Sequence, residues 1–177
     1  MSDSIVAYRY AKSLIDLATE KGVVEEVNKD MVFFKQVSTD NRQFMKAMES
    51  PIVRHDAKLK VLKKIFEGNV NPITFSILTI LTKKNRESLI TSISDEYQKL
   101  YNQQNAIEVA TVTTVEPLTD AQRTEFKELV AKATGKTAQL TEKTDEALIG
   151  GYVLKVGDSQ VDTSIRRKLN DLKLSLN

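Results

Sequence analysis

The spacing of apolar residues changes partway along the chain. Up to about residue 104, apolar positions recur every three or four residues, which places them on one face of a helix. An example of this spacing is the run Val24, Val27, Met31, Phe34 and Val37. The pattern predicts amphipathic helices that pack on one another, and we therefore predict a six-helix bundle in residues 1–104.

The segment from Ile73 to Thr82 differs from the other predicted helices because it is apolar on nearly all sides. Asn71 supplies a cap residue, and Pro72 occupies the first helical position, where its missing N–H costs nothing. A helix that is apolar all round is normally buried. We therefore expect this helix to run through the middle of the bundle.

A polar run from Asn102 to Asn105 follows the last predicted helix and contains no core residue. Beyond it the period changes to two, because Ile107, Val109, Thr111 and Thr113 alternate with Glu108, Ala110, Val112 and Thr114. This alternation predicts a strand, which Glu116-Pro117 ends. We place the domain boundary at this polar run and assign residues 105–177 to a small α+β domain with a mixed sheet and two helices.

The first helix of this small domain follows a capping box made by Thr119 and Gln122. Gly135 is its predicted end. Its predicted inward residues are Phe126, Leu129, Val130 and Ala133. Residues 136–143 are expected to form a second strand. The overall fold class is therefore predicted to be α+β.

Residues 147–169 read ALIGGYVLKVGDSQVDTSIRRKL and contain the materials of a phosphate-binding loop. Such a loop needs its glycines between a strand and a helix, with the first amides of the helix facing the phosphate. Here the alternation from Tyr152 to Val156 predicts a strand that leads to a Gly157-Asp158 hairpin turn. The next helix begins only after Asp162, whose side chain can cap it. Nucleotide binding is therefore not favoured, and Gly150-Gly151 is interpreted as a close backbone approach or a bulge.

Charge and composition restrict the chemistry further. The chain has 26 basic and 24 acidic residues, a formal charge of +2, one histidine and no cysteine. A charge this small does not indicate a nucleic-acid or lipid-binding field. Neither His55 nor Asp56 has a partner at a catalytic or metal-ligand spacing, so we predict no catalytic residue, no metal site and no cofactor. The longest apolar window, near Ile73 to Leu81, is too short to span a bilayer.

Three clusters of basic residues support a nucleic-acid-binding module as an alternative. They are Lys58, Lys60, Lys63 and Lys64, then Lys83, Lys84 and Arg86, then Arg166, Arg167 and Lys168. Such clusters are more often solvated helix faces, and neither a domain pI above about 9 nor adjacent aromatic residues supports nucleic-acid binding. A free-standing helical adaptor is a further alternative.

The C-terminal features, taken in order, resemble one known family. An Ile-Gly-Gly-aromatic strand, a Gly-Asp turn, an Asp before a Ser-Ile-Arg helix start and a leucine-spaced terminal helix are similar to the signature of the ATP synthase delta subunit. This subunit is the bacterial counterpart of the mitochondrial oligomycin-sensitivity-conferring protein. The run from Val6 to Leu14, Ser50-Pro51 and Asn85-Arg86 also match the family's order. The signature positions are Gly150, Gly151, Gly157, Asp158, Asp162, Ser164 and Arg166.

The resemblance implies a noncatalytic stator subunit of the F-type proton-translocating ATP synthase. Members of the family tie the catalytic head to the peripheral stalk, so that the head resists rotor torque. The implied partners are the N-terminal helix of an α subunit and the b subunits of the stalk, with no nucleic acid, no direct membrane insertion and no homo-oligomer. The implied location is peripheral, on the cytoplasmic face of the bacterial inner membrane.

The family's α-subunit site is a groove between the first and fifth helices. Both helices have more apolar surface than one core contact needs, which fits binding of a helix in a groove. On this basis the predicted groove residues are Tyr10, Ala11, Ser13, Leu14, Ile77, Ile80 and Leu81. The alternative from the residues alone is that both helices are central and fully covered.

Overall fold

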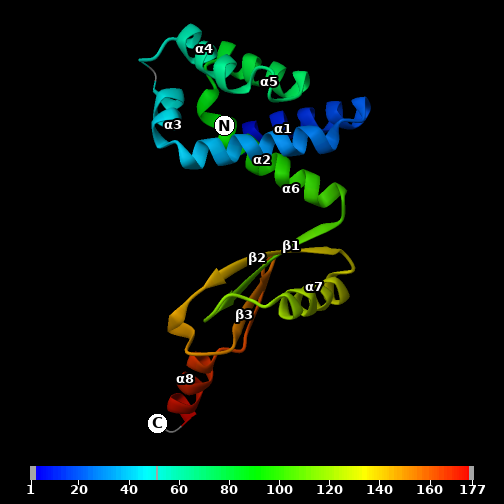
Figure 1. The fold of residues 1–177 in the computed structure, drawn as a ribbon, viewed down its shortest axis with the longest axis vertical. Coiled ribbons are helices and arrows are strands. Elements are labelled where there is room, and N and C mark those ends of the chain that lie inside the picture. The colour runs from blue at the N-terminus through cyan, green and yellow to red at the C-terminus, as the bar shows by residue number, and fades with distance from the viewer. Residues whose placement is uncertain (1–2, 51, 176–177) are drawn as a thin grey trace. The chain divides into compact units, whose positions relative to one another are not determined.

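The computed structural model describes residues 3–50 and 52–175 and divides the chain into two compact units, residues 1–101 and 102–177 (Figure 1). The first unit is helical, and the second combines helices with a four-stranded sheet. The predicted α+β class is confirmed. Pro51 of the Ser50-Pro51 pair and Leu176 of the terminal helix lie outside the described residues.

The helices of the first unit occur in the predicted order, and a short 3-10 turn, η1, precedes the last of them. Their bounds are α1 Asp3–Lys21, α2 Val24–Asp40, α3 Arg42–Glu49, α4 His55–Phe66, α5 Pro72–Lys83, η1 Glu87–Leu89 and α6 Ile90–Gln104.

An aromatic cluster fills the core of this unit. Phe34 stacks on Phe66 with ring centroids 5.0 Å apart, and Phe44 packs edge-on against Phe34 and at a tilt against Phe66. Val27, Met31 and Phe34 are all buried, as the period of the α2 segment predicted. The core therefore joins α2, α3 and α4 through large aromatic contacts, which contribute beyond their buried area.

The predicted central position of α5 is wrong. Ile80 is 49% exposed, whereas Thr74 and Thr82 are almost fully buried. The threonines are tolerated inside because their hydroxyls find acceptors: Thr74 Oγ1 donates to the Asp30 carboxylate at 2.7 Å, and Thr82 Oγ1 donates to the Leu78 carbonyl at 2.8 Å. The buried face of α5 is thus partly polar, and apolar isoleucines lie outside it.

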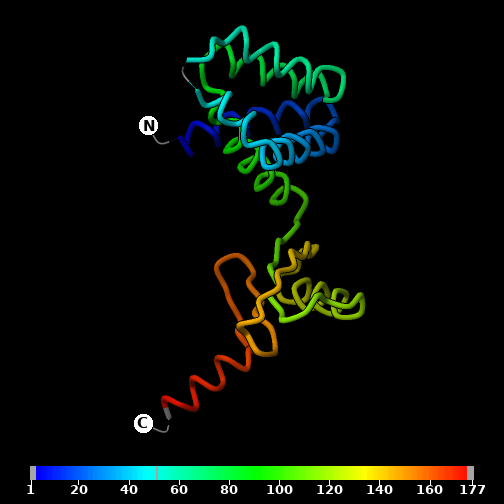
Figure 2. Tube along the Cα trace, turned by 60° about the vertical axis from the view of Figure 1, so that its left-hand side comes forward, coloured from blue at the N-terminus to red at the C-terminus, as the bar shows by residue number. Residues whose placement is uncertain are grey.

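The second unit is built on a mixed sheet, as predicted. Its elements are β1 Ile107–Thr114, α7 Asp120–Thr134, β2 Thr137–Thr144, the 3-10 turn η2 Glu146–Leu148, β3 Tyr152–Val156, β4 Ser159–Asp162 and α8 Ile165–Ser175. The strand order is β2-β1-β3-β4; β1 and β2 are parallel, and the other two pairs are antiparallel. Figure 2 follows the same chain path from a second direction.

The core of this unit lies between the sheet and α7, and it consists of Ala110, Val112, Leu118, Val130 and Leu154. Leu129 and Ala133 were predicted to face inward, but both are exposed. The face of α7 that packs on β1 and β2 contains Phe126 and Val130, which are four residues apart. Leu129 and Ala133 fall on the neighbouring face, away from the sheet.

Candidate functional site

The first helix, α1, has two apolar faces. One is buried in the bundle and consists of Ala7, Ala11, Leu14, Ile15 and Ala18. The other consists of Val6, Tyr10, Ser13 and Leu17, at successive spacings of four, three and four residues. Val6 and Tyr10 are half-buried on this second face, whereas Ser13 and Leu17 are exposed. We call this second face the α1 stripe.

The fifth helix, α5, packs against α1 and carries a comparable face. Ile73, Ile77 and Ile80 lie at spacings of four and three residues, so they share one side of the helix. Ile73 and Ile77 are half-buried, and Ile80 is the most exposed of the three. We call this side the α5 stripe. Both helices therefore present apolar surface that the bundle does not cover.

The structure separates the predicted groove residues into two groups. Tyr10, Ser13, Ile77 and Ile80 lie on the two stripes. Ala11, Leu14 and Leu81 do not, because all three are buried in the bundle core. Neighbouring positions on a helix point about 100° apart, so Ala11 faces the core although Tyr10 does not. These three residues are corrected from partner-contacting positions to core positions.

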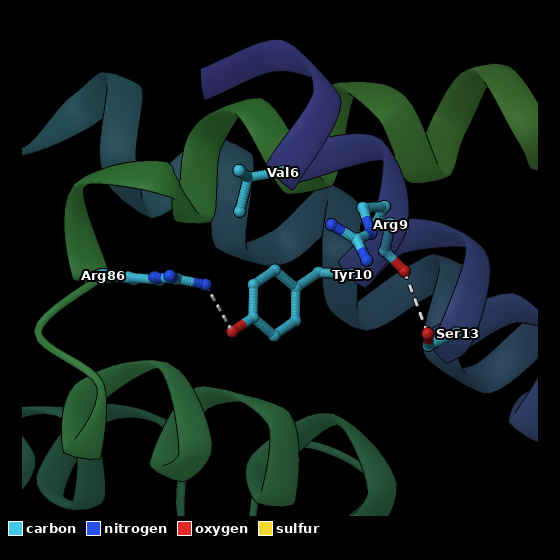
Figure 3. Close-up of a pocket in the computed structure, with 5 residues that line it drawn as sticks. All are labelled: Val6, Arg9, Tyr10, Ser13 and Arg86. Atoms are coloured by element: carbon cyan, nitrogen blue, oxygen red, sulfur yellow. Dashed lines mark hydrogen bonds between the residues drawn. The ribbon is translucent and has the colours of Figure 1, made fainter. Parts of the chain in front are cut away.

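A pocket of about 350 Å³ opens beside the α1 stripe (Figure 3). The described residues that line it are Val6, Arg9, Tyr10, Ser13 and Arg86. Ile77 and Ile80 are not among them. Arg86 reaches the pocket from the segment after α5, and its Nη1 donates to the Tyr10 hydroxyl at 3.2 Å.

The backbone around Asn85 explains how Arg86 is positioned. Asn85 has φ +52°, in the left-handed region where asparagine is better tolerated than most residues. Its N–H donates to the Thr82 carbonyl at 3.1 Å, and the Arg86 N–H donates to the Leu81 carbonyl at 2.9 Å. These two bonds form a Schellman motif that ends α5 and turns the chain back toward α1. The Asn85-Arg86 pair was visible in the sequence, but its place beside Tyr10 was not.

The glycine-rich segment forms the bend and hairpin predicted for it. Gly157 has φ +55° and begins the two-residue turn between β3 and β4, where a glycine fits the first central position. Gly151 has φ +79°, and a Cβ there would lie 2.6 Å from the Thr163 carbonyl oxygen. The close backbone approach expected at Gly150-Gly151 is therefore present. Asp158 completes the turn and is exposed.

The start of α8 is capped differently from the prediction. The helix begins at Ile165, and the hydroxyl of Ser164 accepts the Arg167 N–H at 3.2 Å, so Ser164 is the cap residue. Asp162 instead accepts the Ser164 N–H at 2.9 Å. Hydrogen bonds from Ser164 lower the pKa of Asp162, and Arg167 and Arg166 add to the effect. Arg166 itself is exposed at the helix surface.

The terminal helix α8 extends away from the sheet in both views (Figure 1, Figure 2). Ile165, Leu169 and Leu172 lie at spacings of four and three residues and are all exposed. We call these three residues the α8 stripe. An ion pair between Arg167 and Asp171 lies on the opposite side of the helix.

The remaining candidate residues give no second site. His55 and Asp56 are exposed at the start of α4, and His55 Nε2 lies 2.9 Å from Asp56 Oδ1. Within residues 3–50 and 52–175, no group of three or more histidine, aspartate or glutamate side chains could hold a metal ion. In the same residues, no helix combines the length and the apolar character that crossing a membrane requires.

The basic cluster on α4 was interpreted as a solvated helix face, but one of its members, Lys58, is not a solvated surface charge. Lys58 is buried, and its Nζ lies 3.5 Å from Oε2 of Glu87, which is also buried. A buried lysine needs a partner of opposite charge, and η1 supplies one. No sequence pattern indicates this pair, because its two members lie far apart in the chain and on different elements.

These observations define the class of the protein: a two-unit α+β chain whose distinctive surfaces are exposed apolar helix faces. The family model described as ATP synthase delta (OSCP) subunit matches residues 6–176. The chain belongs to this family, and the resemblance inferred from its sequence is confirmed.

Individual relatives agree with the family match. The ATP synthase subunit delta of Cytophaga hutchinsonii is 45% identical over 98% of this chain and 94% of its own length. The ATP synthase subunit delta of Amoebophilus asiaticus is 35% identical over 95% of this chain and 92% of its own length. A chain in the cryo-EM structure of the Toxoplasma gondii mitochondrial ATP synthase hexamer superposes with a TM-score of 0.76 over 96% of both chains at 24% identity, which shows a shared fold.

Proposed function

We propose that this chain is a noncatalytic stator subunit of an F-type ATP synthase. In this role it links the catalytic head to the peripheral stalk, so that the head resists rotor torque during ATP synthesis. Family membership supports the proposal, and so do the exposed apolar residues on α1, α5 and α8. The protein itself uses no catalytic residue and no cofactor.

The first unit binds the N-terminal helix of an α subunit on the α1 and α5 stripes. The observation that carries this assignment is the exposure of apolar residues on two helices that pack against each other. An amphipathic helix recognises such a surface by burying its own apolar face there. Ser13 is a small residue within the α1 stripe and allows the incoming helix to approach closely.

Single charged substitutions on the two stripes test this assignment. We expect Ser13→Asp and Ile80→Asp to weaken binding of a synthetic α-subunit N-terminal helix by at least about tenfold, because each places a charge in a desolvated contact. The measurement is isothermal titration calorimetry with the full chain. Far-UV circular dichroism should stay unchanged, because both side chains are exposed in the free protein.

Val32 on α2 provides the matched control, because it is 50% exposed and apolar but lies on neither stripe. Val32→Asp should leave peptide affinity unchanged. Equal affinity of Ile80→Asp and the wild type for the peptide would refute the α5 part of the site.

The second unit binds the b subunits of the stalk, and we assign this contact to the α8 stripe. Leu169→Asp should abolish binding to the C-terminal segment of b, while Leu174→Asp should not, because Leu174 projects from the opposite side of α8. Both leucines are exposed, so neither change should disturb folding. Loss of binding in both variants, or in neither, would contradict this assignment.

In this role the chain lies peripherally on the cytoplasmic face of the bacterial inner membrane and does not form a homo-oligomer. A free-standing helical adaptor would use the same stripes but different partners. A nucleic-acid-binding module would show a steep loss of affinity with added salt. Copurification with ATP synthase subunits from native membranes supports the stator role, and its absence would favour one of these alternatives.

A further inference from the structure

We propose that Arg9 and Arg86 form a carboxylate-recognition site for an acidic side chain on the α-subunit helix. This inference rests on the proposed function and goes beyond it. The apolar stripes provide affinity for an amphipathic helix, and the two arginines select one register and one polarity of that helix. The site is the pocket shown in Figure 3.

The first support is the charge of the pocket. Two of its five described lining residues are arginines, two carry hydroxyl groups, and none is acidic. An arginine remains positively charged at any physiological pH. A helix that covered this pocket with apolar or basic side chains would desolvate the Arg86 guanidinium without replacing its hydrogen bonds to water, which is costly. The pocket is therefore complementary to a carboxylate.

The second support is the fixed position of Arg86. The Schellman motif at Asn85 fixes its backbone, and the Tyr10 hydroxyl accepts one of its N–H groups. A guanidinium has five N–H donors in a planar fork, so Arg86 has donors for a second acceptor while it holds Tyr10. An arginine that is already oriented loses less conformational entropy when it binds a carboxylate.

The third support is the place of the pocket relative to the α1 stripe. Val6, Tyr10 and Ser13 belong to both. A helix whose apolar face packs on the stripe therefore brings the border of that face over the pocket. The required partner is an amphipathic helix with aspartate or glutamate at the border of its apolar face. Arg9 lies one position before Tyr10 and completes the lining on α1.

Titration of the full chain with a synthetic peptide of the α-subunit N-terminal helix tests the site. We expect Arg86→Gln and Arg9→Gln each to weaken binding on the order of tenfold, as loss of a charge-assisted hydrogen bond predicts. In a peptide series with each acidic residue changed singly to its amide, one amide peptide should bind the wild type about tenfold more weakly. That same change should have little further effect on Arg86→Gln, because the pair is already broken.

Lys12→Gln is the matched control, because it removes a positive charge of α1 that does not line the pocket. It should bind the wild-type peptide with unchanged affinity. Arg86→Lys keeps the charge but loses the planar fork, and it should give intermediate affinity. Circular dichroism should be the same for all of these variants, since each changed side chain is exposed.

The outcomes separate the two proposals. If the wild type binds the peptide but Arg86→Gln and Arg9→Gln bind equally well, the carboxylate site is wrong and the groove stands. The same conclusion follows if the effects of the arginine change and of the acidic-residue change on the binding free energy are strictly additive. If the wild type does not bind the peptide at all, the groove assignment itself fails.

Discussion

At the scale of single residues, Gly151 is the glycine that the fold restricts most. Its φ of +79° disfavours any side chain, and the Thr163 carbonyl occupies the space that a Cβ would need. Gly150 differs, because a Cβ there would meet only the tip of the Ile165 side chain. Gly135 has φ +70°, but a Cβ there would meet no other atom within 4 Å. A substitution at Gly135 therefore adds backbone strain without a steric clash.

We therefore expect Gly151→Ala to lower the free energy of unfolding by about 3 kcal/mol or more, because it adds a backbone clash to an unfavourable φ. Gly135→Ala should lower it by only about 1 kcal/mol, the backbone term alone. Urea denaturation of both variants checks the difference. Equal losses in the two variants would mean that the contact with Thr163 relaxes freely.

Asp162 gives a pH-dependent prediction. Hydrogen bonds from Ser164 lower its pKa in the folded protein, so the ionised form stabilises the fold. This contribution is present above the ordinary aspartate pKa of about 3.9 and is lost as the pH falls through the lower folded value. Asp162→Asn keeps an oxygen that can accept the Ser164 N–H but does not titrate.

The wild type should therefore be more stable than Asp162→Asn near neutral pH, and the difference should shrink below about pH 4. Thermal unfolding measured across this range provides the test. A difference that stays constant down to about pH 2 would show that the ionisation of Asp162 does not contribute.

At the scale of elements, the sequence predicted where helices occur better than which way they face. The bounds of α5 follow from Asn71 and Pro72, whose cap geometry is local. Its orientation is not local, because it depends on Asp30 of α2 accepting a hydrogen bond from Thr74, 44 positions away. Periodicity assigns a threonine to the polar side and an isoleucine to the core, and here the hydrogen bond reversed that assignment.

The buried pair of Lys58 and Glu87 links α4 to η1. Removing one partner leaves the other buried and uncompensated, so Lys58→Met and Glu87→Leu should each be destabilising, Lys58→Met by about 3 kcal/mol. The double variant Lys58→Met/Glu87→Leu removes both charges and should recover much of this loss. Denaturant unfolding of the wild type, the single variants Lys58→Met and Glu87→Leu and this double variant forms a double-mutant cycle.

Lys60 is the control for this cycle, because it lies on the same helix but is exposed. Lys60→Met should change stability by less than about 0.5 kcal/mol. A double variant as unstable as the sum of its two single variants would show that the Lys58–Glu87 attraction is negligible.

At the scale of the whole molecule, the two units have separate cores. Val130 belongs to the core between α7 and the sheet, and Val27 belongs to the helical bundle. Each is fully buried, so truncating either one to alanine leaves a cavity. The effects of the two changes should therefore be confined to different units.

We expect Val130→Ala to lower the stability of residues 102–177 by about 2 kcal/mol, with little effect on residues 1–101. Val27→Ala should show the reverse pattern. Residue-resolved amide hydrogen exchange by NMR distinguishes the units, because exchange reports local as well as global opening. Equal loss of protection in both units after either change would show that the chain unfolds as one cooperative body.

The sequence by itself determined the features that depend on neighbouring residues. These features are the helices predicted from apolar periodicity, the capping box at Thr119, the strand predicted from alternation and the Gly157-Asp158 turn. Each depends on residues only a few positions apart, so local sequence patterns encode it. The order of the C-terminal features also indicated the family. Tertiary structure alone decided which faces are buried and which distant side chains meet. It placed Ala11 and Leu81 in the core and brought Arg86 to Tyr10 across 76 positions, because packing and hydrogen bonding between separate elements leave no periodic trace in the chain.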